Sequence, residues 1–399
     1  MAVPSAAAAV AATRLSRAAG GGPPTVDRRR PELDPSTALI AAALALPGIV
    51  PSHAVAQTAP DQGVVALRYY DYRDWQPGAD RMSVRSPSLY ALLPVSDTLA
   101  VEGSFVHDAM SGASPLYHDT LSGASGLGVT DYRTAADVKV TRYGASQSIG
   151  LGAAYSSERD YESRAASAEW RAWSDDRNRT YALGFAAAHD RIDSTNGVAR
   201  DRRRETYDFL AGATQVLSAT AVVESSITWS DGRGYYSDPY KLLDARPDHR
   251  RIFAWLTRFN QYVPSADATL HVAYRYLHDS FGDQSHMLEA SCVQSLPADF
   301  TVTPTLRYLT QDAATFYRDP PFPQHFVDDG PNTADTRLSA FGAITAGVRL
   351  AKAFAGGVTV DVATTFYRQR AGWHVGGSGS PGIAGFSARW IEIGLEKRF

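Results

Sequence analysis

The stretch TYALGFAAAHD at residues 180–190 alternates large apolar side chains with small or polar ones. Tyr181, Leu183 and Phe185 occupy every second position, and their neighbours are threonine, alanine and glycine. A period of two residues places the two sets on opposite faces of a β-strand. This stretch therefore predicts a strand with one apolar face and one face of small or polar residues.

The same alternation recurs along the chain after Gln57, for example at 269–279 and 337–350. It predicts an all-β fold, an antiparallel up-and-down transmembrane β-barrel of about sixteen strands. The expected strands are 64–72, 81–93, 97–107, 135–144, 148–158, 162–173, 180–192, 203–216, 220–230, 250–262, 267–278, 285–296, 301–311, 336–350, 357–369 and 386–398.

Pro87 and Pro304 fall inside two of the expected strands. Because proline lacks the backbone N–H that a sheet ladder needs, each should mark a bulge or a slip in the expected register. Fourteen strands is the alternative count.

The expected connections alternate between short and long. Short turns opposite long loops are typical of barrels in the bacterial outer membrane, and an even strand number returns both ends to the periplasmic side. The short connections are 94–97, 144–147, 174–179, 217–219, 263–266, 297–299 and 353–356, and the long ones include 108–134, 231–249, 312–335 and 370–385.

Residues 1–56 read as a leader with a secretory signal peptide, and residues 57–399 as the barrel. The longest apolar run, 38–50, is too short for a transmembrane helix. It follows three arginines at 28–30 and precedes the small-x-small site 54–56, so cleavage is expected after Ala56. A buried core helix is the weaker interpretation, because Pro47 and Pro51 would break it.

The last nine residues resemble the assembly signal of outer-membrane barrels: Ile391, Ile393 and Leu395 share a face and Phe399 ends the chain. That resemblance implies docking on the barrel-assembly machinery by β-augmentation and a place in the Gram-negative outer membrane. Lys397 departs from the pattern, which usually has an apolar residue there. The alternative is an amphipathic edge strand that ends in phenylalanine by chance.

The positions opposite the apolar set should line the interior, where charge is tolerated, whereas Arg or Lys facing lipid costs about 2–4 kcal/mol. The expected inward set has nearly equal numbers of acidic and basic residues. This balance argues against a strongly ion-selective pore and is compatible with ion pairs across the lumen. The expected inward set is Glu102, Glu169, Asp208, Glu224, Glu289, Asp361 and Glu392 with Lys139, Arg171, Arg258, Arg275, Arg307 and Arg349.

Three His-Asp dipeptides lie at the upper ends of expected strands, with histidine outward and aspartate inward: His107-Asp108, His189-Asp190 and His278-Asp279. Imidazole and carboxylate groups could bind a divalent cation or contact lipopolysaccharide. The favoured interpretation is that these residues only supply the polar side chains that strand ends need, because the pairs lack the tight spacing of a metal site. An embedded hydrolase would need a serine beside His107 and Asp108, and serine is too common in these loops to discriminate.

The segments 86–90 (SPSLY) and 106–115 (VHDAMSGASP) resemble domain of unknown function 3570, a family of proteobacterial outer-membrane proteins. The resemblance implies a barrel with no established substrate. Members often lie near genes for periplasmic flavin transfer, which hints at an extracytoplasmic redox or metal setting, although no residue pattern here indicates a flavin or haem site.

The Ser-Gly-Ala-Ser-Pro sequence at 111–115 is typical of a tight turn. A structural loop at the pore mouth is the favoured interpretation. The sharper hypothesis is that Asp108, Ser111 and Ser114 supply oxygen ligands to a cation.

Composition narrows the function further. The 39 Lys and Arg nearly balance the 42 Asp and Glu, and no basic stretch alternates with aromatics, so a nucleic-acid partner is not expected. The single Cys292 cannot form an internal disulfide. We expect a channel, transporter or structural component that contacts outer-membrane lipid and lipopolysaccharide, with unknown substrate and no cofactor beyond the cation just considered. A barrel enzyme and a secreted soluble β-protein are the alternatives.

Overall fold

The computed structural model describes residues 57–112, 129–241, 244–319 and 330–399, so the expected leader lies outside the described residues. Sixteen strands account for most of this part of the chain. They are β1 (Val64–Gln76), β2 (Ala79–Ser96), β3 (Leu99–Gly112), β4 (Val129–Tyr143), β5 (Gln147–Ser157), β6 (Tyr161–Trp173), β7 (Arg179–Ile192), β8 (Arg202–Ser218), β9 (Ala221–Gly234), β10 (His249–Val263), β11 (Ala268–Asp279), β12 (Gln284–Leu296), β13 (Phe300–Gln311), β14 (Phe341–Phe354), β15 (Val358–Arg370) and β16 (Phe386–Arg398).

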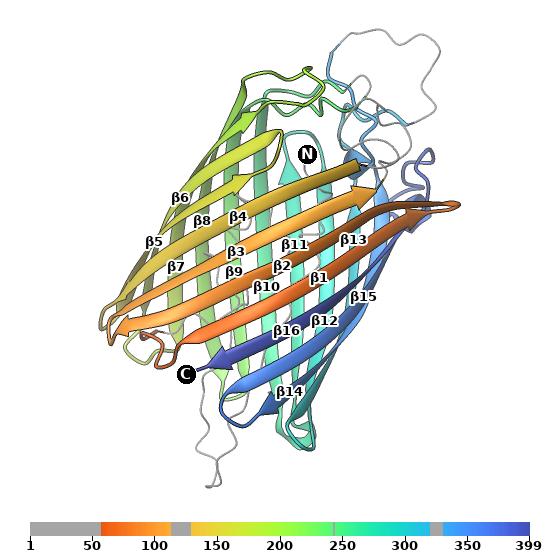
Figure 1. The fold of residues 1–399 in the computed structure, drawn as a ribbon. Coiled ribbons are helices and arrows are strands. Elements are labelled where there is room, and N and C mark those ends of the chain that lie inside the picture. The colour runs from red at the N-terminus through yellow and green to blue at the C-terminus, as the bar shows by residue number, and fades with distance from the viewer. Residues whose placement is uncertain (1–56, 113–128, 242–243, 320–329) are drawn as a thin grey trace.

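The strands form one closed antiparallel barrel in which each strand pairs with its neighbours in sequence (Figure 1). The barrel closes where β1 pairs with β16, from Val64 opposite Arg398 to Trp75 opposite Ser387. At the same seam the backbone N–H of Gly63 donates to the carbonyl of Phe399 (2.9 Å), and that of Phe399 donates back (3.1 Å). The expected fold and the count of sixteen strands are confirmed.

Pleating gives every strand an outer and an inner face. In β7 the side chains of Tyr181, Leu183 and Phe185 are exposed on the outside, and Ala182 and Ala186 are buried inside. The outside of the other strands is apolar as well, for example Leu151 on β5 (61% exposed) and Leu288 on β12 (53%). A continuous apolar belt around a closed barrel matches hydrocarbon rather than water, and closure leaves no unpaired strand edge in the belt.

The expectation about the two prolines is wrong. Pro87 pairs with Tyr69 of β1, and Pro304 pairs with Val348 of β14, inside strands that keep one register on both sides of each proline. A strand residue directs its N–H toward only one neighbouring strand, so a proline interrupts one ladder and leaves the other intact. The register shifts instead lie at the strand ends, between Arg73 and Trp75, Pro94 and Ser96, and Val216 and Ser218.

Turns of up to five residues join the strands at the end that carries the C-terminus, and most of the longer loops lie at the opposite end (Figure 1). One connection at the loop end is shorter than expected. Strands β1 and β2 continue to Gln76 and Ala79 and are joined by Pro77-Gly78 alone. Gly78 adopts a φ of +80°, which glycine tolerates without strain, so this hairpin closes as a tight turn.

Among the described residues, no helix is both long and apolar enough to cross a membrane.

Candidate functional site

The inner wall carries the charges that the alternation predicted, and most of them are paired. Arg307 donates from Nε to Oε2 of Glu289 at 2.6 Å, and Arg258 donates to Glu224 at 3.0 Å. Arg349 bridges two carboxylates, Asp361 and Glu392. The remaining pairs include Lys139 with Glu102 and Glu169, and Arg171 with Glu169.

The three rim aspartates face inward as expected, and each meets an arginine of the neighbouring strand. Asp108 accepts from Arg133, Asp190 from Arg204, and Asp279 from Arg250. Asp279 also accepts from the backbone N–H groups of Phe281 (2.9 Å) and Asp283 (3.1 Å), and so holds the turn between β11 and β12.

The rim histidines point the other way. His107 stacks on Tyr132 with ring centroids 5.9 Å apart, and Nδ1 of His189 lies 3.6 Å from Glu205. His278 is exposed on the outer face. The two members of each His-Asp pair therefore lie on opposite faces of the wall and cannot both bind the same ion.

The structure does not assemble the cation site suggested around Asp108. Ser111 belongs to β3, but its side chain, like Ser114, lies outside the described residues. Within the described ranges no three His, Cys, Asp or Glu side chains are grouped so that they could hold a metal ion. The cation hypothesis stays a prediction.

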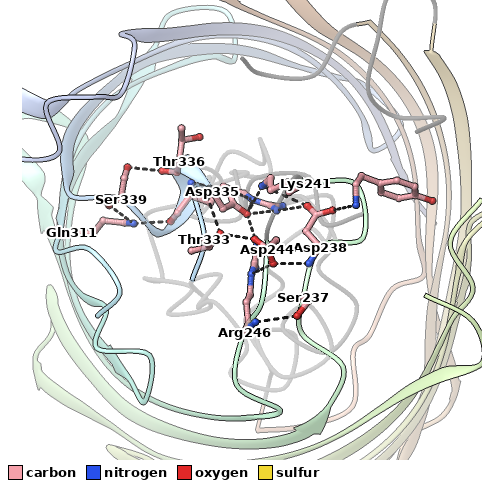
Figure 2. Close-up of polar contacts among 12 residues, drawn as sticks. Ser237, Asp238, Lys241, Asp244, Arg246, Gln311, Thr333, Asp335, Thr336 and Ser339 are labelled. Atoms are coloured by element: carbon pink, nitrogen blue, oxygen red, sulfur yellow. Dashed lines mark hydrogen bonds and ion pairs between the residues drawn. The ribbon is translucent and has the colours of Figure 1, made fainter. Parts of the chain in front are cut away.

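The most extensive polar structure lies inside the extracellular mouth. Parts of two loops, residues 235–241 and 244–248 after β9 and residues 312–319 and 330–340 after β13, fold inward and meet within the ring of strands (Figure 2). Their backbones pair through Ala245 and Asn332, with N–H···O distances of 2.8 and 2.7 Å. We call their six charged residues the mouth cluster: Asp238, Lys241, Asp244, Arg246, Asp335 and Arg337.

Asp335 is the centre of the mouth cluster. Its Oδ2 lies 2.5 Å from Nζ of Lys241 and accepts from Nη2 of Arg246 at 2.8 Å. Arg337 donates from Nε to both carboxylate oxygens, at 2.9 and 2.8 Å. One carboxylate that binds three cations from two loops ties those loops together.

The other two carboxylates complete the network. Asp244 accepts from Nε and Nη2 of Arg246 at 2.8 and 2.9 Å, and Asp238 accepts from Nη2 of Arg337 at 3.2 Å. Three carboxylates and three cations sum to zero charge, as a buried ionic network requires if it is to offset desolvation.

The electrostatics keep the cluster ionised at its centre. Burial alone would raise the pKa of Asp335, but Arg337, Lys241 and Arg246 together hold that pKa well below its usual value. Burial, followed by repulsion from Arg337, lowers the pKa of Lys241. Removing the Asp335 charge would therefore leave three cations close together and poorly compensated.

Apolar packing and wall contacts fix the two loops in place. Leu338 packs with Phe281, Ala314 and Phe316, and the rings of Phe281 and Phe316 meet edge to face at 5.0 Å. Gln311, on the inner face of β13, donates to the carbonyls of Arg337 (2.8 Å) and Ser339 (3.0 Å).

Two further connections join the same assembly. Tyr240 donates to Asp160, in the turn after β5, at 2.5 Å, and accepts from the backbone N–H of Thr195, in the loop after β7, at 3.0 Å. The mouth is therefore spanned by loops that support one another rather than by one free loop.

Sequence reasoning identified both loops as long connections but assigned them no role. The charged partners Lys241 and Asp335 lie 94 residues apart (335 − 241), and no local pattern joins them. The alternation of charges at Asp238, Lys241, Asp244 and Arg246 was the only available signal.

The expected assembly-signal residues are placed as the alternation required. Ile391, Ile393 and Leu395 are exposed on the outer face of β16, and Phe399 is 63% exposed at the seam. Lys397 lies on the same outer face, so the departure from the pattern is real. Docking on the assembly machinery stays a prediction.

Solved structures with similar folds are outer-membrane barrels of low sequence identity. CdiB from Acinetobacter baumannii aligns with a TM-score of 0.47 and 8% identity, covering 83% of this chain and 60% of that one. The siderophore receptor PirA from Pseudomonas aeruginosa gives 0.40 and 11%, covering 77% and 56%. OccK2 (OpdF) from Pseudomonas aeruginosa gives 0.44 and 12%, covering 85% and 98%. The chain thus spans 60% or less of the CdiB and PirA chains, and the likeness extends to the barrel fold and no further.

No curated protein matches this sequence. The sequence profile described as "Protein of unknown function (DUF3570)" matches residues 122–202 and 195–390. The match covers more than half of the chain and spans β4 to β15 in full, although it begins after segments 86–90 and 106–115, which first suggested the resemblance. The chain therefore belongs to the DUF3570 family and has the closed sixteen-stranded barrel of an outer-membrane protein.

Proposed function

We propose that this protein is an outer-membrane channel for small solutes, whose extracellular mouth is narrowed by the mouth cluster and its two loops. The observation that carries the proposal is the combination of an apolar outer belt with an inner wall lined by ionised side chains. Charged side chains line a membrane barrel on the inside only where water or a polar solute can solvate them. A transport role accounts for this interior better than a catalytic one, because the described residues present ion pairs rather than an arranged nucleophile and base.

The mouth cluster sets the expected conductance. Inward-folded loops that bind one another reduce the open cross-section, and paired charges of both signs give weak ion selectivity. We therefore expect small current steps with little preference between K⁺ and Cl⁻ in planar bilayers.

Replacing Asp335 with asparagine tests this role of the loops. The change leaves Lys241, Arg246 and Arg337 without their shared counter-ion, so the loops should separate and the single-channel conductance should rise at least twofold with added noise. Full-length protein extracted from outer membranes in detergent is the sample, and its heat-modifiable gel migration confirms the folded barrel.

Asp176→Asn is the matched control, because it makes the same change in an exposed turn at the other end of the barrel. It should conduct like the wild type. If neither the wild type nor the Asp335→Asn variant raises the current above that of the lipid bilayer alone, the result contradicts a channel and favours a structural role. If Asp335→Asn and Asp176→Asn both give larger current steps than the wild type, the mouth cluster is not what narrows the channel.

A further inference from the structure

The inner wall formed by β9 to β13 carries a surplus arginine. Three carboxylates of these strands face inward, Glu224, Asp279 and Glu289, and each binds an arginine of its own, Arg258, Arg250 and Arg307. Arg275, on β11, makes no ion pair or side-chain hydrogen bond with any described residue, and its Nε is buried without an acceptor. The wall therefore holds four guanidinium groups against three carboxylates.

The sheet register shows why Arg275 has no partner. Arg258, Ala273 and Glu289 lie side by side across β10, β11 and β12, and Arg307 follows on β13. Arg275 stands two residues further along β11, beyond Ala273, on the same inner face. It is thus one step outside the row in which the charges pair, although Arg307, Glu289 and Arg258 still act on it electrostatically.

The cross-strand neighbours of Arg275 are apolar. Leu256 of β10 and Met287 of β12 pair with it directly. Leu309 of β13 follows opposite Met287, and Ala343 of β14 opposite Leu309. These four residues, which we call the luminal shelf, point inward, where most other side chains are polar or small. Together, the unpaired Arg275 and the luminal shelf form a surface that is partly cationic and partly apolar inside a polar lumen.

We propose that Arg275 and the luminal shelf form a binding site for an organic carboxylate with an apolar body. A carboxylate would accept from Nε and one Nη of the guanidinium as a bidentate pair, which satisfies the buried Nε. The apolar part of the ligand would cover the partly exposed side chains of Leu256 and Leu309, and removing such surface from water is favourable. The site rests on the proposed channel function, since the lumen must admit the ligand.

The two parts of this surface favour an organic carboxylate over both inorganic phosphate and neutral aromatic solutes. Inorganic phosphate would bind the guanidinium but would leave the partly exposed Leu256 and Leu309 uncovered. A neutral aromatic solute would cover these two side chains but leave the surplus charge uncompensated. Only a ligand with both features uses both parts of the surface.

Benzoate is the probe, and titration calorimetry on full-length protein in detergent measures its affinity. Benzamide is the neutral analogue of the same shape, and acetate is the carboxylate without the apolar body. We expect benzoate to bind at least about tenfold more tightly than either, because a charge-assisted pair and the buried ring each contribute more than 1.4 kcal/mol. Phosphate that binds as tightly as benzoate would overturn the role of the luminal shelf.

Two variants separate the parts of the site. Arg275→Gln should weaken benzoate at least about tenfold, and Leu309→Asn should weaken benzoate while it leaves acetate unchanged. Arg164→Gln is the matched control, because Arg164 points outward near the rim with a side chain 70% exposed, and it should not change the affinity. Heat-modifiable migration shows that each variant is folded.

The outcomes distinguish this site from the channel. Equal benzoate affinity in the wild type and in Arg275→Gln, in a barrel that conducts, refutes the site and leaves the channel. Benzoate binding that depends on Arg275 in a barrel that never conducts refutes the channel and retains the site.

Discussion

Asp283 is the residue whose ionisation is set most clearly by its position. It lies in the turn after β11, buried, with no hydrogen-bond partner for Oδ1 among the described residues. Burial, followed by repulsion from Asp279, raises the pKa of Asp283 to about 7. Arg250 donates to Asp279 rather than to Asp283, so Asp283 is left to titrate near neutral pH.

This pKa makes barrel stability depend on pH. The folded state holds the Asp283 proton up to about pH 7, whereas the unfolded chain releases it near pH 4. Between these values the folded state binds more protons, so the free energy of unfolding falls as pH rises, by an amount on the order of a few kcal/mol. Asp283→Asn removes this loss, and should therefore stabilise the protein more at pH 8 than at pH 5.

Urea unfolding in lipid vesicles at pH 5 and pH 8 measures the effect. Asp176→Asn, an exposed carboxyl in a periplasmic turn, should keep the wild-type difference between the two pH values. An equal gain from Asp283→Asn at both pH values would show that the pKa of Asp283 is ordinary.

At the scale of the strand, the two-residue alternation predicted which side chains face outward and which face the lumen. The inward charge of β12, Glu289, was assigned correctly from parity alone, because a pleated strand leaves no other choice. The same reasoning failed at Pro87 and Pro304, because parity does not reveal toward which neighbour a residue directs its N–H. It also treated Arg275 and Arg307 alike, since pairing depends on the register between strands.

The outer face of β12 gives a direct test of the lipid-facing belt. Leu288→Arg places a charge near the middle of the strand, where we expect a loss of about 2–4 kcal/mol in the free energy of unfolding. Urea unfolding in vesicles measures it. Val198→Arg, at an exposed apolar residue in the loop after β7, is the control and should change little. Similar losses in both variants would be inconsistent with a belt in hydrocarbon.

At the scale of the whole molecule, the strand count could be predicted because each hairpin is local, whereas the mouth cluster could not. Its contacts join loops from different hairpins, and Asp335 approaches Lys241 only after the barrel has brought β9 and β13 to the same rim. Closure through β1 and β16 is another long-range contact, and only the even strand number indicated it.

Closure can be tested with a disulfide across the seam. Leu67 and Leu395 lie directly opposite on β1 and β16, so cysteines at both positions, in a Cys292→Ser background, should oxidise to a cross-link in most folded molecules. Gel migration after oxidation and heating detects it. Cysteines at Leu67 and Leu350, which lie on strands that are not neighbours, should stay reduced. Cross-linking in both pairs, or in neither, would contradict this seam.

The paired backbones of Gly63 and Phe399 have a consequence for quality control. A barrel without β16 has two bare edges, each a row of N–H and C=O groups that hydrocarbon cannot solvate. Partial closure is therefore not a stable stopping point. Damage confined to this last strand should therefore prevent stable insertion of the whole barrel rather than leave an open, leaky barrel in the membrane.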